Sequence, residues 1–348
     1  MDEMNADSGL QISDSAGRVN PARGGFFRSL IRNPQSAIGY LLAVAGLIWV
    51  LHDVEFERLR SSFSHLNWRW IALAIACDIL SYVCQGIRWQ KLLKPIGDIS
   101  TIRATQAIYV GLFTNEILPM RLGELARAYL VSRWSAANFL TVIPSMMVER
   151  VFDGFWLMVG IGLTALIVPL PKYLLRAADV LGIGLVIASL ILFYLITRQT
   201  NRSSETGIGL LASLNEKLSK ALKGMGKTRG FYLSLAWSMP LLMFQGLAFW
   251  LVMLGCGLHL PFWSGAAVFL IVHLGTAIPN APANIGAYQF FTVVGLTLFG
   301  VDKSVATGFS MVVFLLLTAP LWVLGLIALS QSGTTLAKIR REVKLSGT

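Results

Sequence analysis

The sequence predicts an all-α membrane protein, a polytopic bundle of transmembrane helices, and its composition and apolar patterning lead to that fold class. The chain has 348 residues, of which 55% are hydrophobic and only 14% charged, and its mean hydropathy is +0.65. Soluble domains carry roughly 25% charged residues, so this composition belongs in a bilayer. The apolar residues are gathered into long segments separated by polar loops. Roughly 20 such residues are needed to cross the hydrocarbon core as a helix.

Apolar length places the individual elements. The expected full spans are residues 36–51, 70–93, 139–168, 178–196, 231–256 and 304–329. Two pairs of segments, 104–118 with 122–134 and 262–278 with 285–299, are shorter than a full crossing. Apolar stretches this short are typical of re-entrant elements, and broken backbone at membrane depth must be covered by protein or line a cavity. We expect about six full spans and two broken-helix hairpins, or about eight spans by conventional counting.

A single transmembrane domain, residues 36–330, is predicted between two polar tails. Residues 1–35 contain no apolar core of the kind a signal peptide needs, so a disordered cytoplasmic tail is expected there. Residues 331–348 are expected to form a basic cytoplasmic tail. Tryptophans near the ends of the segment 70–93 (Trp68, Trp70 and Trp89) have the positions of interfacial anchors.

The largest basic loop, residues 198–230, carries leucines that recur every four residues, with lysines turned away from them. The leucines are Leu210, Leu214, Leu218 and Leu222. This pattern predicts an amphipathic helix on the cytoplasmic surface. A solvated linker helix docked on its neighbours fits the pattern equally well.

The net charge of +11 does not indicate nucleic-acid binding, because of where the cations lie. All but four of the 29 Lys and Arg residues lie in loops and tails. With the N-terminus inside, most of these cations fall on the inner side, as positive-inside asymmetry requires. Both termini of this multi-pass protein are therefore expected in the cytoplasm, with the spans in the plasma (inner) membrane.

The remaining four arginines lie within or beside apolar segments and need an explanation. They are Arg88, Arg121, Arg127 and Arg150, and the acids placed in the same way are Asp78, Glu116, Glu124, Glu149 and Asp153. Each charge at the bilayer centre costs about 3 kcal/mol unless it faces protein or a water-filled cavity. The spacing of Glu149, Arg150 and Asp153 puts the two acids on one helical face and lets Arg150 reach Asp153. These charges either line a polar site or tie the first hairpin to the long helix as buried ion pairs.

The two proline-bearing turns resemble each other. Pro119, Arg121 and Gly123 align with Pro282, Asn284 and Gly286 at a constant offset of 163 residues. Broken helices at corresponding positions of two inverted halves are typical of a transporter's binding site. Chance recurrence of a short Pro/Gly pattern is the alternative.

Little else in the sequence points to chemistry. The histidines (His52, His65, His259 and His273) are scattered, and Cys77, Cys84 and Cys256 fit packing roles. No metal-ligand spacing or Gly-rich phosphate loop occurs, so no cofactor and no metal are expected. An enzyme is not favoured, although paired carboxylates can serve a lipid-linked transferase.

The charged motifs carry a family resemblance. N-E-I-L-P-M-R-L-G-E-L-A-R-A at residues 115–128, E-R-V-F-D at 149–153, Arg88-Trp89 and the late P-A-N-I-G resemble the lysylphosphatidylglycerol synthase transmembrane region family. In the family pattern, the second hairpin has Pro-Gly-Gly-x-Gly followed by a glutamate. Here Ala283 and Asn284 replace the two glycines and Gln289 replaces the acid, which indicates a divergent member or a different substrate. Few residues follow the last span, so a stand-alone member without an aminoacyl-transferase domain is expected.

The resemblance implies a flippase-like protein that binds and translocates a phospholipid or lipid-linked headgroup. The alternative is an accessory or catalytic membrane subunit of headgroup or glycosyl transfer, as in cell-envelope or hopanoid-type lipid synthesis. The expected partners are a membrane lipid with an anionic or zwitterionic headgroup and lipid-biosynthetic enzymes. The predicted substrate-binding residues are Arg88, Asn115, Glu116, Arg121, Glu124, Arg127, Glu149, Arg150, Asp153, Asn280, Asn284 and Gln289.

Arg121→Ala is expected to lose lipid translocation while still folding, because an arginine fork binds phosphate bidentately. Translocation of lipid in proteoliposomes measures the effect. Unchanged transport would remove Arg121 from the mechanism.

Overall fold

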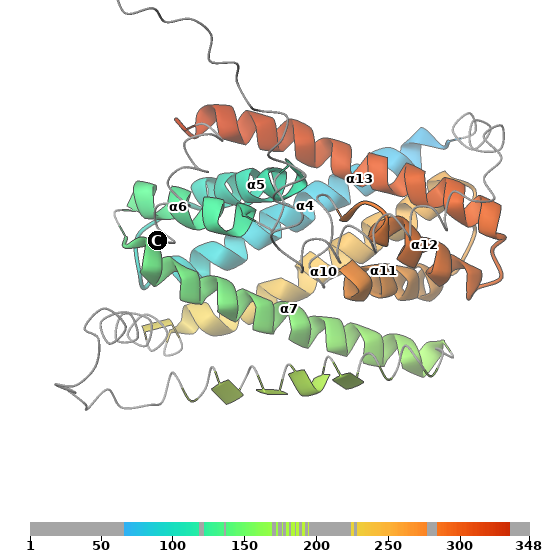
Figure 1. The fold of residues 1–348 in the computed structure, drawn as a ribbon, viewed down its shortest axis with the longest axis horizontal. Coiled ribbons are helices and arrows are strands. Elements are labelled where there is room, and N and C mark those ends of the chain that lie inside the picture. The colour runs from blue at the N-terminus through green and yellow to red at the C-terminus, as the bar shows by residue number, and fades with distance from the viewer. Residues whose placement is uncertain are drawn as a thin grey trace, which may run out of the picture.

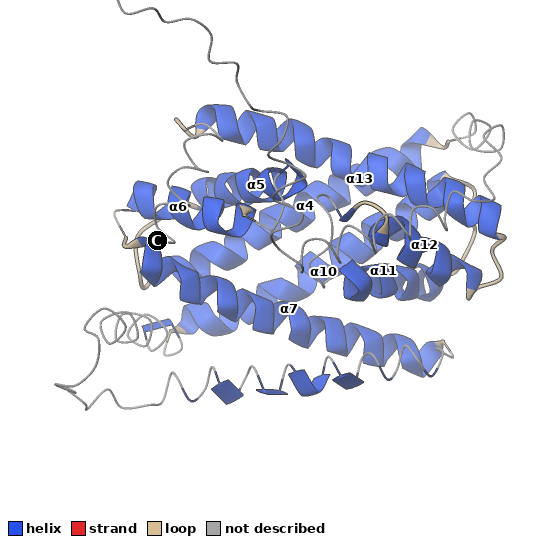
Figure 2. Cartoon of the chain, in the orientation of Figure 1, coloured by secondary structure: helices blue, strands red, loops and turns tan. Residues whose placement is uncertain are grey.

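The computed structural model describes residues 66–117, 122–135, 137–168, 228–276 and 284–334, with Gly224, Met225 and separate residues between 172 and 194. The described part is all-α (Figure 2). Its helices are α4 (Trp68–Leu93), α5 (Thr101–Ile117), α6 (Gly123–Ser135), α7 (Phe139–Ile167), α10 (Arg229–Gly255), α11 (Phe262–Thr276), α12 (Ala287–Thr297) and α13 (Lys303–Gln331). Four of them, α4, α7, α10 and α13, are long and apolar enough to cross a membrane.

The predicted segment boundaries agree with these helices to within about three residues, as is usual at helix ends. The first expected span, 36–51, and the N-terminal tail lie outside the described residues, as do most of the loop 198–230 and the C-terminal tail beyond residue 334. The described residues between 172 and 194 are helical. Which side of the membrane each end faces stays a prediction.

Helix ends are set by short polar residues next to the apolar runs. The Asn67 side chain accepts a hydrogen bond from Arg69 N at 3.2 Å and starts α4. Asn138 and Asp302 cap α7 and α13 in the same way, at 3.0 Å and 2.8 Å. Between such caps, a helix satisfies its own backbone groups, as lipid requires.

The long helices lie along one direction, and the short ones occupy the two ends of the bundle (Figure 1). α4 and α10 pack extensively against each other through the middle and run in opposite directions. α7 and α13 lie on opposite sides and also run in opposite directions. The pair α5 and α6 fills one end beside α4, and the pair α11 and α12 fills the other.

The order and lengths of the helices repeat along the chain. α4 to α7 have 26, 17, 13 and 29 residues, and α10 to α13 have 27, 15, 11 and 29. The starts of α7 and α13, Phe139 and Lys303, are 164 residues apart, and so are their ends. Each set thus has a long helix, two short helices and another long helix.

Large apolar side chains are exposed on the outside of the long helices. Leu166 of α7, Tyr232 of α10 and Val323 of α13 are 83%, 68% and 58% exposed. Apolar surface on this scale is typical of a face that meets another apolar phase. It fits helices whose outer sides contact lipid.

Two glycines let α5 and α6 approach each other closely. A Cβ on Gly123 would overlap the carbonyl oxygen of Gly111, and a Cβ on Gly111 would lie 2.8 Å from the carbonyl oxygen of Gly123. Both carbonyl oxygens belong to the backbone, which cannot swing aside as a side chain can. The hairpin geometry therefore depends on glycine at both positions.

We expect Gly123→Ala to destabilise the protein by about 1–3 kcal/mol, because the added methyl group forces two backbones apart. Unfolding of the purified protein in mixed micelles measures this. Gly162→Ala in α7 is the matched control, since nothing lies within 4 Å of its would-be Cβ. The control should be neutral or stabilising by up to about 1 kcal/mol, and an equal loss in both variants would contradict the packing argument.

Candidate functional site

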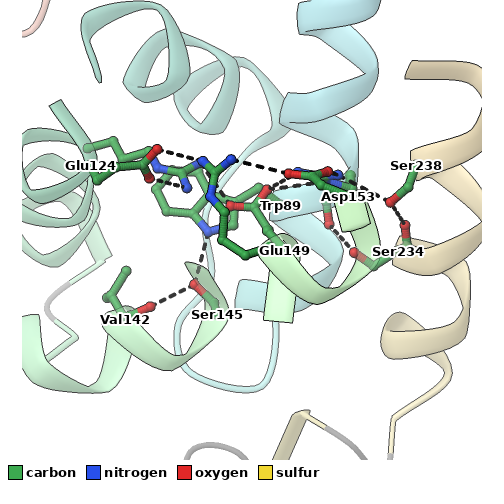
Figure 3. Close-up of polar contacts among 11 residues, drawn as sticks. Trp89, Glu124, Val142, Ser145, Glu149, Asp153, Ser234 and Ser238 are labelled. Carbon is green, nitrogen blue, oxygen red and sulfur yellow. Dashed lines mark hydrogen bonds and ion pairs between the residues drawn. The ribbon is translucent and has the colours of Figure 1, made fainter. Parts of the chain in front are cut away.

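Glu149 lies at the centre of a buried set of ion pairs (Figure 3). Its Oε1 accepts hydrogen bonds from Arg88 Nη2 at 2.8 Å and Arg88 Nε at 3.2 Å. Its Oε2 lies 2.8 Å from Arg127 Nη1. One carboxylate of α7 therefore holds an arginine from α4 and an arginine from α6.

Three further residues close these pairs into a ring. Arg127 Nη2 lies 2.6 Å from Glu124 Oε2, and Glu124 Oε1 accepts from Arg150 Nη2 at 2.6 Å. Arg150 Nη1 reaches Asp153 Oδ2 at 3.4 Å, and Arg88 Nη1 donates to Asp153 Oδ1. We call Arg88, Glu149, Arg127, Glu124, Arg150 and Asp153 the ion ring. Cations and anions alternate around it, and its formal charges cancel.

The ion ring has a dry side and an open side. The side chains of Glu149, Arg88 and Arg127 are 0%, 1% and 4% exposed. Those of Asp153 and Glu124 are 23% and 25% exposed, and that of Arg150 is 54% exposed. Arg150 is thus the ring cation most able to meet another group.

Neutral side chains brace the dry side. The Arg127 guanidinium carbon lies 4.7 Å from the centroid of the Trp89 ring, a cation–π contact. Trp89 Nε1 in turn donates to Ser145 Oγ at 2.9 Å, and Arg88 Nη1 donates to Ser238 Oγ at 3.2 Å. Trp89 is fully buried, so the expectation that it anchors the chain at the membrane interface is wrong.

A cavity of about 450 Å³ lies against the open side of the ion ring. Arg88, Arg150 and Asp153 form the ring's part of its wall. Asp78, Glu116 and Asn284 are further polar residues of the lining, while the remainder is largely aromatic and aliphatic. The cavity therefore combines charged, polar and apolar lining residues, inside a bundle of apolar helices.

Two acids outside the ring also line this cavity. Asp78 is only 4% exposed, and its Oδ2 has no hydrogen-bond partner. Glu116 Oε2 accepts a hydrogen bond from Trp322 Nε1 at 3.5 Å, the longest distance at which such a bond forms. Within the described residues, neither acid forms an ion pair with a lysine or arginine.

The structure thus brings six of the predicted residues together in the ion ring, and two more, Glu116 and Asn284, line the cavity beside it. The predicted contact of Arg150 with Asp153 is confirmed. Arg121 and Asn280 lie outside the described residues.

Asn115 and Gln289 have structural partners instead. Asn115 Oδ1 accepts from Gly123 N, and Gln289 Oε1 accepts from Gly286 N, each at 2.7 Å. Both amides thereby satisfy a backbone donor at the start of a short helix, α6 or α12. Asn284 has φ 52°, a left-handed conformation that asparagine tolerates better than most residues, which explains how it replaces glycine in the family pattern.

Sequence reasoning left several cavity residues out of the predicted site. Asp78, Tyr82, Gln245 and Tyr288 all line the cavity. Gln245 and Asp78 did carry a signal, since each is an isolated polar residue within a long apolar run. In the described residues no cluster of His, Cys, Asp and Glu could hold a metal ion, and Cys77, Cys84 and Cys256 are free.

An apolar bundle with candidate spans and a charged internal cavity defines a multi-pass membrane protein with a polar site among its helices. Residues 36–325 match the family model described as the lysylphosphatidylglycerol synthase TM region. The chain belongs to this family, as its charged motifs indicated, and the match covers most of its length.

Three proteins of archaea are similar to this chain, and two of them are named as membrane proteins. UPF0104 membrane protein MJ1595 of Methanocaldococcus jannaschii is 22% identical over 313 residues, 79% of this chain and 88% of the relative. MJ1078 of the same organism is 24% identical over 199 residues, 56% of this chain and 82% of the relative. Glycosyltransferase AglD of Haloferax volcanii is 28% identical over 116 residues, which span 33% of this chain but 19% of AglD.

We expect Glu149→Gln to destabilise the protein by about 3–5 kcal/mol, because it takes one carboxylate from two buried guanidinium groups and leaves the ring with one uncompensated positive charge. Arg150→Gln should cost about 1 kcal/mol or less, since its side chain is half exposed and Glu124 keeps Arg127. Unfolding of both variants in mixed micelles measures the difference. Equal losses would mean that the burial of a ring residue does not determine how much it contributes to the free energy of unfolding.

Proposed function

We propose that this protein binds the headgroup of a phospholipid or lipid-linked molecule in the cavity and moves it across the plasma membrane. The observation that carries this proposal is the cavity of about 450 Å³, lined by ionised side chains within an apolar bundle. Charges at membrane depth that face a cavity mark substrate pathways. Membership of a family named for a lipid synthase's membrane region supports a lipid ligand.

Arg150 is the residue best placed to take the headgroup phosphate. Its two terminal nitrogens already touch Glu124 and Asp153, yet a guanidinium offers five N–H donors and more than half of this side chain is exposed. Arg88 and Arg127 are buried and held by Glu149, so in the proposal they fix the ring rather than bind lipid. Arg121 precedes α6 in sequence and is proposed as a second phosphate ligand.

Apolar residues of the second set of helices suit the apolar part of an amphipathic ligand. With α10 aligned to α4 and α13 to α7 at their first residues, Arg88 corresponds to Phe249, Arg150 to Phe314 and Asp153 to Leu317. All of these residues line the cavity. Charged and apolar lining residues thus occupy equivalent positions in the two sets of helices, and a lipid carries both kinds of group.

We further propose that the two sets of helices form an inverted repeat and that their short helices are re-entrant hairpins. The repeated lengths, the opposite directions of paired long helices and the location of the short pairs at opposite ends support this arrangement. Inverted repeats with broken helices allow a central site to open alternately to either side. In the proposed topology both termini are cytoplasmic and the α5–α6 hairpin enters from the cytoplasm.

We expect Arg150→Gln to lower headgroup binding by about 10- to 100-fold, because hydrogen bonds to charged groups are worth about 1.5–3 kcal/mol. Native mass spectrometry of the purified protein with defined phospholipids measures binding, and a fluorescent-lipid assay in proteoliposomes measures translocation. Arg103→Gln is the matched control, since Arg103 is exposed at the start of α5. Equal binding by wild type and both variants would refute phosphate recognition by Arg150.

The alternative function is that of an accessory or catalytic subunit of lipid headgroup or glycosyl transfer. The similarity to part of a protein named glycosyltransferase AglD favours it. Incubation with lipid-linked sugar donors and membrane extracts separates the two functions. An unmodified lipid moved between leaflets supports translocation, whereas a modified lipid product supports transfer.

A further inference from the structure

The cavity contains one buried acid whose charge no described cation offsets. Asp78 lies on α4, ten residues before Arg88, which places the two about 15 Å apart along the helix at 1.5 Å per residue. The ion ring is neutral within itself, so it supplies no spare positive charge. An ionised Asp78 would therefore be a lone anion in a medium of low dielectric, which costs several kcal/mol.

Asp78 and residues of two helices that pack on α4 have buried oxygens without hydrogen-bond partners. Asp78 Oδ2, Gln245 Oε1 and Tyr109 Oη are all buried and have no hydrogen-bond partner. Arg88 of α4 donates a hydrogen bond to Ser238 of α10, and Ile71 of α4 packs against Gly255 of α10. These two contacts fix the antiparallel register of α4 and α10. In this register Gln245 falls opposite Ser81, within one turn of Asp78. Asp78 and Gln245 both line the cavity.

We propose that Asp78 and Gln245 form a binding site for a monovalent cation, either a proton or Na⁺, in the wall of the cavity. A bound cation removes the unmatched charge and gives the unpartnered oxygens a ligand in one step. Oxygen ligands suit hard cations, and a single carboxylate among neutral oxygens matches a single positive charge. A divalent ion is not favoured, because in the described residues no cluster of acids and histidines could hold one.

Other titratable or charged groups share this cavity and face the site from the surrounding helices. They are Tyr82 and Arg88 of α4, Glu116 of α5, Arg150 and Asp153 of α7, His273 of α11 and Tyr288 of α12, while the lining residues of α10 and α13 do not ionise. Arg88, Arg150 and Asp153 are paired within the ion ring. Asp78 differs from them in combining near-complete burial with an unpartnered oxygen, so the cation is assigned to it.

The test measures cation binding in detergent without added lipid, in two arms. Infrared difference spectra across a pH titration detect a protonated carboxyl group. Thermal unfolding in sodium chloride against choline chloride detects Na⁺ as an upward shift in melting temperature. In at least one arm a signal is expected from wild type and lost in Asp78→Asn. Asp98→Asn, the same change at an exposed acid, should keep the signal.

A signal that persists in Asp78→Asn, or no signal from wild type in either arm, would overturn the proposal. Should Asp78→Asn fail to fold, Gln245→Leu takes its place and must either weaken Na⁺ binding or move the midpoint of the carboxyl titration. No change in either quantity would also overturn the proposal. Coupling of the cation to headgroup movement rests on the proposed function, but cation binding does not. Failure in this assay therefore leaves headgroup binding, measured separately by native mass spectrometry, to stand or fall by itself.

Discussion

The neutralisation of Glu149 is the interaction on which the rest of this structure depends. Its carboxylate is fully buried, and two arginines from different helices hold its two oxygens. One arginine would neutralise this carboxylate by itself, and the second leaves one positive charge, which Glu124, Asp153 and Arg150 together offset. The shared carboxylate therefore holds α4, α6 and α7 together at one point. The other two acids of the ring are paired in the same way, since Glu124 and Asp153 each contact two arginines. Charge balance, rather than apolar packing alone, fixes where α6 sits on α7.

A buried ion network of this kind is weak evidence for stability, because well-packed apolar residues of similar volume often stabilise a protein as well or better. The second set of helices illustrates the point. The residues 164 positions after Glu149, Arg150 and Asp153 are Val313, Phe314 and Leu317, and these apolar residues accompany helices of the same lengths. Helices of this order and these lengths therefore form in the second set without such charges, whereas in the first set the charges, once buried, have to be paired. Their concentration in one half, next to a cavity, is what a binding role explains.

Sequence reasoning recovered the elements that depend on local pattern. Helix positions followed from apolar length, and the pair of Arg150 with Asp153 followed from its spacing of three residues on one helix. The contact of Arg88 with Glu149 joins residues 61 positions apart, and no local pattern specifies it. Trp89 was misplaced for the same reason, because the arginine that covers its ring comes from α6. The unmatched charge of Asp78 became visible only when the partners of every other buried charge were known.

The neutrality of the ion ring also bears on how a headgroup would move. A phosphate that binds Arg150 competes with the carboxylates already there, and the contact of Arg150 with Asp153, at 3.4 Å, is the longest in the ring. Asp153 retains Arg88 when that contact is lost, so this exchange leaves no unpaired carboxylate. Displacing Glu124 from Arg150 would also remove a link between α6 and α7, since Glu124 lies on α6 and Arg150 on α7. A ligand shifts a conformational equilibrium only when it interacts differently with the two states. In the proposed function, competition for Arg150 would supply such a difference, because the guanidinium that holds the α5–α6 pair in the empty cavity would hold the headgroup in the filled one.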